Sequence, residues 1–382
     1  MGDSGDLKVS GEIIKAIYNL SCPYGEASKK AREICVEQTV EFPEDLIKRE
    51  DIKSQLIGKI ISLRSLSPNL NEAIIGYPVE AAGDELPQLL NLLFGNISIQ
   101  PGVRLVSFEL PRTLLSKFKG PRFGRTGIRA ILKAKERPLL CTALKPMGFT
   151  PRELAELAYK FALGGMDMIK DDHGLADQSF CRFEERVKRV AEAIGKASAK
   201  IGEPCLYFPN VTGPYDEIER RCHTAKNAGA GGFVVSPGLV GFDTMRRIAD
   251  GDDLALPVLS HPALLGSFTA SSTSGISHGA LYGQINRLAG ADACIFPNYG
   301  GRFTFSRDEC REIADATEID MSKIVRIFPV PAGGMSLDRI PELKSFYGNE
   351  MIFLIGGNLH RHGPDLVENC KVFKQMACGG VF

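Results

Sequence analysis

The chain has 382 residues, which is too long for one small core and suits a domain of about 100 to 150 residues joined to a second of about 250. Lysine and arginine together number 46, as do aspartate and glutamate, so no net charge favours nucleic acid or an anionic membrane as partner. No apolar run approaches the roughly 20 residues that span a bilayer. Composition therefore favours a protein of two domains that acts on a small molecule.

The cysteines and the first residues indicate the compartment. Ten cysteines are scattered without CxxC pairs, and residues 1–6 have neither a basic start nor an apolar signal core. These features predict a cytoplasmic protein with reduced thiols. Cys141, Cys205 and Cys294 stand inside apolar β runs, where cysteine usually behaves as a small buried hydrophobe rather than as a nucleophile.

The first third of the chain mixes strands and helices. Residues 13–18 and 59–63 read as strands, and residues 25–38 and 86–93 read as amphipathic helices, which together predict an α+β domain. Residues 119–127 are rich in glycine and arginine and separate this region from a different pattern. We therefore expect one domain over residues 1–122 and a second over residues 123–382.

The second region alternates short apolar β runs with helical stretches. The runs are residues 139–144, 166–169, 205–208, 232–235, 257–260, 293–296, 324–328 and 351–355. Thr150 and Pro151 begin one of the helices as N-cap and first helical residue. Eight β-then-α units predict a closed parallel (β/α)8 barrel with its site at the carboxyl ends of the strands. An open doubly wound sheet is the alternative, but it requires a glycine-rich nucleotide turn that residues 145–148 do not provide.

The second of these runs ends in a charged segment. Residues 164–173 read GGMDMIKDDH, and Lys170, Asp172 and His173 are spaced so that their side chains could converge on one cation. An ordinary ion pair at the strand end is the alternative. Polar residues also follow other strands and would share the same rim of a barrel, namely Lys145, Asn210, His261 and Asn298. Packing alone does not require this density of polar groups, so the rim is predicted to be an active site.

Two glycine-rich turns follow the seventh and eighth runs. Ala332-Gly333-Gly334 and Gly356-Gly357 would let backbone N–H groups approach an anion, and these two loops are the customary phosphate site of such barrels. We therefore expect a phosphorylated ligand; two plain tight turns are the alternative.

Mg²⁺ prefers oxygen ligands, and Asp172 supplies them. The amine of Lys170 serves such an ion only after CO₂ converts it to a carbamate, which is an inference from chemistry rather than from spacing. His173 could be a nitrogen ligand, a residue that orients a ligand, or a general base. Of the other histidines, His261 at the fifth strand end is the stronger catalytic candidate, and His278, before the sixth strand, is a weaker candidate for contact with the substrate.

These motifs together resemble the RuBisCO superfamily over nearly the whole chain. Residues 164–173 resemble its metal-binding signature, residues 144–146 its catalytic lysine motif, and residues 331–334 and 355–357 its two phosphate-binding turns. The resemblance implies an N-terminal ferredoxin-like domain, a barrel, and a carbamylated Lys170 beside Asp172 on Mg²⁺. It also implies a homodimer in which the partner's N-terminal domain closes the site with its turn at Asn96.

The departures from the carboxylases of this superfamily are also informative. Those enzymes have a glutamate at the position of His173, a second lysine at Met147, an arginine at Pro262 and a serine at Ala332, and Gln284 takes the place of the lysine of their sixth loop. The lost groups bind a second phosphate and direct CO₂ addition. The chain therefore resembles the RuBisCO-like proteins of form IV, and carboxylation of a bisphosphate is not expected.

The resemblance implies an enzyme that forms an enediolate from a phosphorylated keto sugar. Lys145 is the first candidate for proton transfer, followed by His261 and His173. Isomerisation of 5-methylthioribulose 1-phosphate is the leading expectation, because the tautomerases of the superfamily look more like the carboxylases at the third ligand. A decarboxylase of a phosphorylated oxo sugar acid, a diketo-methylthiopentyl-1-phosphate enolase and a non-catalytic sugar-phosphate sensor are the alternatives.

Overall fold

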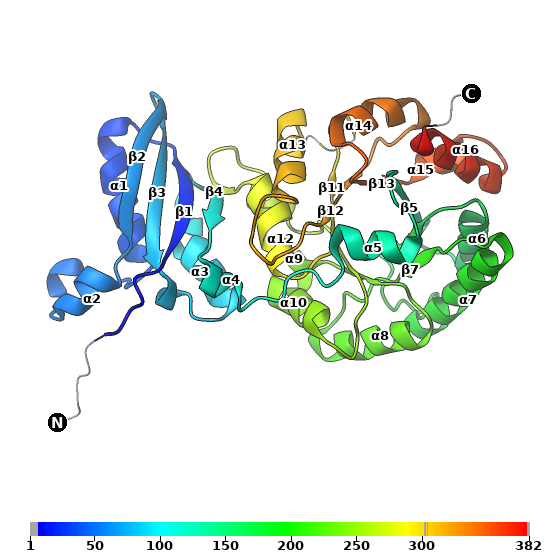
Figure 1. Ribbon diagram of the computed structural model, residues 1–382, viewed down its shortest axis with the longest axis horizontal. Coiled ribbons are helices and arrows are strands. Elements are labelled where there is room, and N and C mark those ends of the chain that lie inside the picture. Colours follow the sequence, from blue (N-terminus) through cyan, green and yellow to red (C-terminus); the bar gives the residue numbers. More distant parts are fainter. Residues whose placement is uncertain (1–6, 302, 304, 380–382) are drawn as a thin grey trace. The chain divides into compact units, whose positions relative to one another are not determined.

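The computed structural model describes residues 7–301, 303 and 305–379, and the contacts within it define two compact units (Figure 1). Unit 1 comprises Met1–Phe118, Leu265–Gln284 and Asp320–Ile324, and unit 2 comprises Lys119–Leu264, Ile285–Ile319 and Val325–Phe382. The domain boundary between residues 122 and 123 stays a prediction, and so does any reading of residues 1–6, which lie outside the described part.

Unit 1 is a sheet with helices on it. Its strand order is β10-β4-β1-β3-β2, in which β1 is antiparallel to both β3 and β4. The strands are β1 (Ile13–Leu20), β2 (Lys59–Ser67), β3 (Leu70–Pro78), β4 (Val103–Glu109) and β10 (Gly275–Ile276). The helices are α1 (Tyr24–Glu37), α2 (Glu50–Gln55), α3 (Leu86–Phe94), α4 (Arg112–Leu115) and α11 (Gly266–Thr269), with a π-helix over Gly279–Ile285. The β-α-β-β-α-β order confirms the predicted ferredoxin-like domain.

Alternation explains why β1 forms the centre of this sheet. Every second residue from Ile14 to Leu20 is fully buried, while the residues between them are partly exposed. The buried Tyr18 donates its hydroxyl proton to the carbonyl of Leu93 at 2.7 Å, which ties the strand to the end of α3. A period of two with one apolar face is the pattern of a half-buried strand.

Unit 2 contains eight parallel strands in the order β7-β6-β5-β13-β12-β11-β9-β8. They are β5 (Leu139–Leu144), β6 (Met168–Asp171), β7 (Leu206–Phe208), β8 (Phe233–Val235), β9 (Val258–Ser260), β11 (Ala293–Pro297), β12 (Phe328–Ala332) and β13 (Ile352–Ile355). The two ends of this order meet through an isolated parallel bridge between Asn210 and Val234. The predicted parallel barrel is thereby confirmed as a nearly closed one.

Helices surround these strands (Figure 1). They are α5 (Gly124–Leu132), α6 (Pro151–Leu163), α7 (Phe183–Ile201), α8 (Tyr215–Asn227), α9 (Pro237–Val240), α10 (Phe242–Asp250), α12 (Asn286–Leu288), α13 (Arg307–Ala316), α14 (Ile340–Tyr347), α15 (Gly357–Arg361) and α16 (Leu366–Cys378). Thr150 caps α6 as predicted, since its side chain accepts the N–H of Glu153 while the Glu153 carboxylate accepts the N–H of Thr150.

The seventh barrel strand is the element that the sequence placed wrongly. It was expected over residues 324–328, but β12 runs from Phe328 to Ala332. Proline at 329 and 331 argues against a strand in sequence reasoning, because proline donates no ladder hydrogen bond. The residues before β12 instead bond to the first helix of the unit, Gly124–Leu132. The carbonyl of Arg326 accepts the N–H of Arg125 at 3.1 Å.

The barrel interior shows how the site is positioned. Cys141, Met168, Phe208, Val234 and Leu259 belong to the apolar cluster inside the barrel. Since strand side chains alternate in direction, the residues two positions later also face inward, but nearer the carboxyl ends of the strands. Those residues are Ala143, Lys170, Asn210, Ser236 and His261. The alternation therefore places polar side chains directly above an apolar floor.

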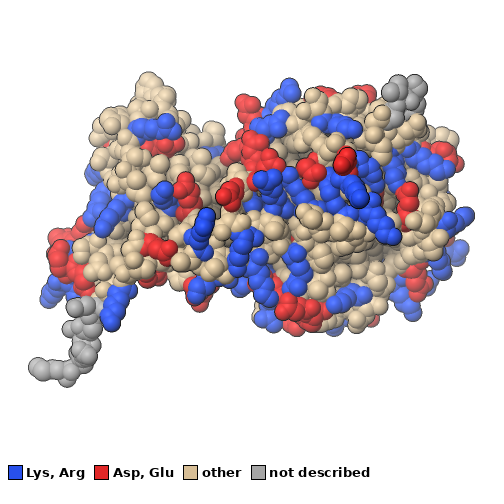
Figure 2. Space-filling model, in the orientation of Figure 1, with Lys and Arg blue, Asp and Glu red and all other residues tan. Residues whose placement is uncertain are grey.

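The helices and the surface charge are consistent with the composition. Among the described residues, no helix is both long and apolar enough to cross a bilayer. On the face drawn in Figure 2, acidic and basic side chains are interspersed, as their equal numbers in the sequence suggest.

Candidate active site

Lys170 lies at the inner end of β6 and is almost fully buried. Its side chain is 2% exposed, and Nζ donates a hydrogen bond to the carbonyl oxygen of Asp171 at 2.7 Å. Burial lowers the pKa of this amine, and the nearby charge of Lys145 lowers it further, while Asp172 acts in the opposite direction. The lowered pKa makes the neutral amine, which is the form that reacts with CO₂, easier to reach than in an exposed lysine.

Asp172 is the centre of a cluster of charged side chains. Its Oδ1 atom lies 3.0 Å from Nζ of Lys145 and 3.4 Å from Nδ1 of His173. Partial burial alone would raise the pKa of this carboxyl, but the contact with His173 and the charges of Lys170 and Lys145 outweigh it, so the pKa is lowered. The carboxylate is therefore ionised and accessible at the open side of the site.

Two histidines meet across the mouth of the barrel. The rings of His173, after β6, and His261, after β9, stack with centroids 4.4 Å apart and planes inclined by 15°. Nδ1 of His261 accepts the N–H of Ala263 at 3.2 Å, which places the ring proton on Nε2. Burial lowers the pKa of His261, so the ring is neutral and carries its proton on Nε2. Its catalytic role stays a prediction.

A second network holds the loop that carries His173, and the sequence reading missed it. Asp171, which is 0% exposed, accepts hydrogen bonds from Arg186 Nε at 3.1 Å, the Tyr207 hydroxyl at 2.7 Å and the N–H of Asn210 at 3.1 Å. The side-chain amide of Asn210 in turn donates to the carbonyl of His173 at 3.0 Å. The alternation of β6 was the available signal: if Lys170 points inward, then Asp171 must point outward.

The glycine turns lie at the ends of β12 and β13, where they were predicted. Gly333 and Gly334 have φ of +87° and +66°, which glycine adopts without strain. A Cβ atom added at Gly333, Gly356 or Gly357 would meet nothing within 4 Å. Among the described residues, no hydrogen bond is formed by the N–H groups of Gly333 and Gly334. These turns offer open backbone donors of the kind that bind an anion.

The fit of a divalent cation depends on the state of Lys170. Within the described part of the chain, no group of three or more His, Cys, Asp or Glu residues could hold a metal ion. The Asp172 carboxylate is one hard ligand, and a carbamate on Lys170 would add a second within the same cluster. His173 and His261 stack on each other beside this cluster. The role of His173 as a nitrogen ligand stays a prediction.

Three further residues from the sequence reading lie in unit 1. Asn96 is exposed, and its amide donates to Glu37 at 3.0 Å; His278 is 3% exposed, lies 3.5 Å from Arg104 and stacks on Tyr282. Their roles in substrate binding stay predictions. Gln284 was wrongly matched to the sixth loop: its amide bonds both backbone groups of Phe108, and the loop after the sixth barrel strand begins only after Pro297.

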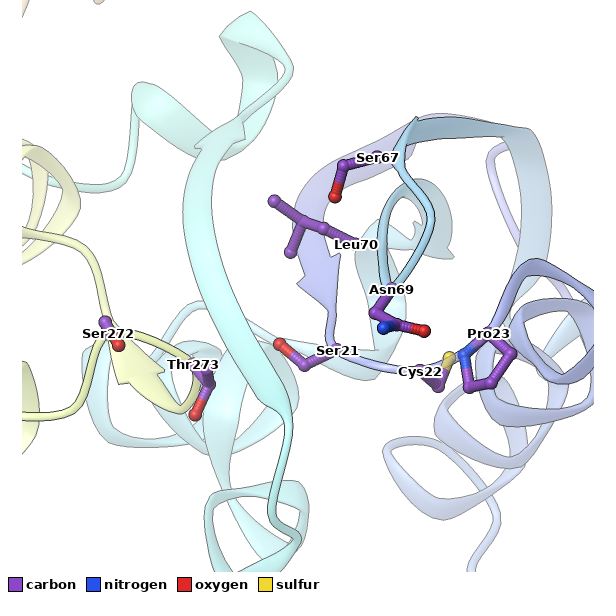
Figure 3. Close-up of a pocket in the computed structure, with 8 residues that line it drawn as sticks. All are labelled: Ser21, Cys22, Pro23, Ser67, Asn69, Leu70, Ser272 and Thr273. Carbon is purple, nitrogen blue, oxygen red and sulfur yellow. The ribbon is translucent and has the colours of Figure 1, made fainter.

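Two other features do not compete for the chemistry. Burial raises the pKa of the Cys141 thiol to about 12 and raises that of Cys205 and Cys294 as well, so none of the three is a reactive thiolate. A surface hollow of about 510 Å³ in unit 1 is lined by Ser21, Cys22, Pro23, Ser67, Asn69, Leu70, Ser272 and Thr273 (Figure 3). It has no charged lining residue, whereas the barrel mouth gathers two lysines, a carboxylate and two imidazoles.

Comparisons with known proteins agree with this geometry. Residues 125–375 match the family described as ribulose bisphosphate carboxylase large chain, catalytic domain. The 5-methylthioribulose-1-phosphate isomerase of Rhodospirillum rubrum is 36% identical over 96% of each chain. The 2,3-diketo-5-methylthiopentyl-1-phosphate enolase of Bacillus licheniformis is 32% identical over 94% of this chain and 90% of its own length.

A solved structure extends the likeness to the whole fold. The crystal structure of a Rubisco-like protein from Rhodopseudomonas palustris superposes with a TM-score of 0.88 at 37% identity, covering 98% of this chain and all of the other. The match includes both units and the strand ends that carry the cluster. The chain therefore belongs to the RuBisCO large-chain family and is one of its RuBisCO-like proteins.

Proposed function

We propose that the protein is a Mg²⁺-dependent enzyme that enolises a phosphorylated keto sugar and isomerises 5-methylthioribulose 1-phosphate or a close analogue. The observation that carries this proposal is the cluster of Lys145, Asp172 and the buried Lys170, whose pKa is lowered. Two enzymes of sulfur-sugar phosphates are among the relatives, which supports the substrate class. Retention of two lysines around one carboxylate also argues against a mere sensor of the ligand.

Asp172 and carbamylated Lys170 would hold the Mg²⁺ ion. When bound, this ion polarises the substrate carbonyl and its neighbouring hydroxyl and so acidifies the adjacent C–H. Lys145, 43% exposed and directed at Asp172, is the residue that we assign to moving the proton from one carbon to its neighbour. Nε2–H of His261 donates a hydrogen bond toward the oxygen on which negative charge develops.

The phosphate end of the substrate is assigned to the turns after β12 and β13. The N–H groups of Gly333, Gly334, Gly356 and Gly357 would bind the phosphate oxygens, with Ala332 at the base of the first turn. A second phosphate has fewer partners, because Met147, Pro262 and Ala332 are uncharged. A substrate with one phosphate and an uncharged far end is therefore favoured over a bisphosphate.

We also propose a cytoplasmic homodimer in which the partner subunit completes the site. The family resemblance supports this assembly, and Asn96 and His278 are its candidate substrate contacts. Sedimentation of the protein with and without a phosphoketose would test the assembly directly. A monomer with full turnover would contradict it.

Proton exchange tests the chemistry. The protein is incubated with Mg²⁺, bicarbonate and 5-methylthioribulose 1-phosphate in deuterated water, beside a panel of carboxylated and sulfur-containing sugar phosphates. Deuterium incorporation next to the carbonyl with formation of an isomer supports the proposal. Release of CO₂ would indicate a decarboxylase, tautomerisation of a diketo substrate would indicate an enolase, and binding without exchange would indicate a sensor.

Lys170→Ala is the decisive variant for the carbamate. It removes the group that CO₂ modifies, so we expect loss of Mg²⁺-dependent turnover with phosphate binding retained. Lys160→Ala, at an exposed lysine of α6, is the matched control. Unchanged turnover in Lys170→Ala would reject the carbamate assignment.

A further inference from the structure

We infer that Arg339 is a positioning residue that fixes the Gly333–Gly334 turn for anion binding. The inference rests on the proposed phosphate role of this turn and adds a residue that the sequence reading did not single out. Arg339 stands just before α14 and its side chain is 17% exposed. It acts through backbone groups rather than by contact with the substrate.

One guanidinium links three segments of the chain. NH1 donates to the carbonyl of Tyr299 at 3.1 Å and to the carbonyl of Gly334 at 3.4 Å, while Nε donates to Glu342 at 3.2 Å. The guanidinium also lies 5.2 Å from the centre of the Tyr299 ring. The guanidinium of Arg339 therefore joins the loop after β11, the turn after β12 and the start of α14.

Glycines allow the two loops that Arg339 joins to approach each other closely. A Cβ on Gly334 would lie 2.9 Å from Cα of Gly301, and a Cβ on Gly300 would lie 3.2 Å from the guanidinium nitrogens of Arg339. Gly300 has φ of +68° and Gly334 has φ of +66°. The two loops thus touch backbone to backbone, and neither turn can shift without the other.

The polarity of the peptide group explains why this contact bears on anion binding. The carbonyl of Gly334 accepts from Arg339 and from the N–H of Ser336 at 3.1 Å. The Gly334 carbonyl and the Met335 N–H belong to one planar peptide, so the bond from Arg339 fixes the orientation of the peptide that follows the two glycines. A Cβ on Gly333 would meet nothing within 4 Å, so the turn is open beside this residue.

Glu342 holds the arginine in this orientation. Its carboxylate accepts from Arg339 Nε and, at 2.8 Å, from the hydroxyl of Tyr299. A guanidinium can make these bonds together because its donors are fixed in one plane, whereas a lysine ammonium on a flexible stem cannot reach all three partners. The role therefore depends on the shape of the group and not on its charge alone.

Binding of inorganic phosphate is the test. Its dissociation constant is measured by calorimetry for the wild-type protein and for Arg339→Lys, Arg339→Gln and Glu342→Gln. Both Arg339 variants should lose about tenfold in phosphate affinity, which matches the loss of one hydrogen bond to a charged group at about 1.4 kcal/mol. Glu342→Gln should lose about threefold, because it loosens the arginine without removing it.

A matched control lies on the preceding helix, α13. Arg311 stacks on the Phe346 ring at 4.0 Å and bonds the Phe346 carbonyl, but it does not contact the turn. Arg311→Lys should bind phosphate like the wild type. Mg²⁺ affinity should be unchanged in all variants, which a general loss of structure would not allow.

The outcomes separate the alternatives. Wild-type affinity in Arg339→Lys would show that charge alone suffices and would overturn the positioning role, as would wild-type affinity in Arg339→Gln. If phosphate binds the wild type but Gly333→Ala leaves that binding intact, the anion lies elsewhere and the inference fails. Deuterium exchange in the wild type would then still stand as evidence for the proposed reaction.

Discussion

Asp171 and Asp172 are neighbours in the chain, and both are carboxylates beside cations, yet they have different surroundings. Asp171 is fully buried on the outer side of β6, where Arg186, Tyr207 and Asn210 hold it with fixed donors. Asp172 faces the barrel mouth and pairs with Lys145 and His173, whose side chains are 43% and 47% exposed. A carboxylate whose hydrogen-bond partners are all buried and fixed, such as Asp171, has a structural role. A carboxylate whose partners are exposed, such as Asp172, can exchange them for a ligand.

Asp172→Asn tests the carboxylate that we assign to ligand binding, and its effect on turnover should be the largest of all. The amide removes the charge that we assign to cation binding, so we expect turnover to fall by at least about a thousandfold. The free energy of unfolding should stay within about 1 kcal/mol of the wild type, since the partners of Asp172 are exposed. Steady-state kinetics with the exchange substrate and urea unfolding measure the two quantities. Substantial turnover in the variant would count against the site.

Arg186→Met tests the structural role of Asp171 and should lower the stability of the protein. Removal of the arginine leaves Asp171 charged and buried, which costs about 3 to 5 kcal/mol of unfolding free energy. Arg189→Met, one turn further along α7 at an exposed position, is the control and should change stability by less than about 0.5 kcal/mol. Urea unfolding of both variants decides the point. Equal stability of the two would mean that the buried pair does not hold the loop.

Asp292 sharpens the comparison, because it is buried without an arginine in hydrogen-bond contact. It accepts the N–H groups of Phe123, Gly124 and Val258 at 2.7 to 2.8 Å, and burial raises its pKa from 3.8 to about 6. The folded state therefore binds more protons than the unfolded state between pH 3.8 and 6. Stability should fall by up to about 1.4 kcal/mol per pH unit as pH rises through this window, with no further loss from this group above it.

Asp292→Asn is the variant that checks this dependence. It cannot titrate, so the difference in unfolding free energy between variant and wild type should change between pH 4 and pH 6.5 and stay constant above. Urea unfolding at several pH values measures it. A difference that is constant over the whole range would show that the three N–H donors keep the pKa of Asp292 near its ordinary value.

Gly356→Ala should give the smallest effect. It extends the comparison from the two carboxylates to a turn that we assign to the anionic phosphate. Gly356 has a negative φ of −103°, and an added Cβ meets nothing within 4 Å, so stability should change by less than about 0.5 kcal/mol. A bound phosphate would contact the new methyl group, and we expect its affinity to fall about fivefold, or about 1 kcal/mol. Calorimetric titration with inorganic phosphate checks the value. Unchanged affinity would place the anion away from this turn.

The sequence predicted most of the fold because apolar runs report burial directly. All eight barrel strands were anticipated. The largest displacement is that of β12, because Pro329 and Pro331 make its sequence unlike a strand. The second strand, β6, begins two residues later than predicted. Lys170 and Asp172 were found because charge at the end of an apolar run is unusual. The partners of Asp171 were not found, because Arg186 and Tyr207 come from later elements and only the folded chain brings them to β6.

The positioning network around Arg339 could not be read from the sequence for a similar reason. Arginine before a helix is common, and its bonds go to backbone carbonyls, which leave no trace in the order of side chains. Gln284 shows the opposite error: a motif match suggested a catalytic loop, but its amide is used up on Phe108. Composition and motifs therefore point to the candidate reactive groups, and miss the groups that hold the candidates in place.

The bridge between Asn210 and Val234 has a dynamic consequence. The cylinder of strands is sealed there by the bonds from Val234 N to Pro209 O, at 2.9 Å, and from Val211 N to Val234 O, at 3.1 Å. Local opening of the barrel is expected to begin at this bridge, because few hydrogen bonds must break there together. The side-chain amide of Asn210 also donates to the carbonyl of His173, so a transient separation of these edges would loosen the segment that carries His173.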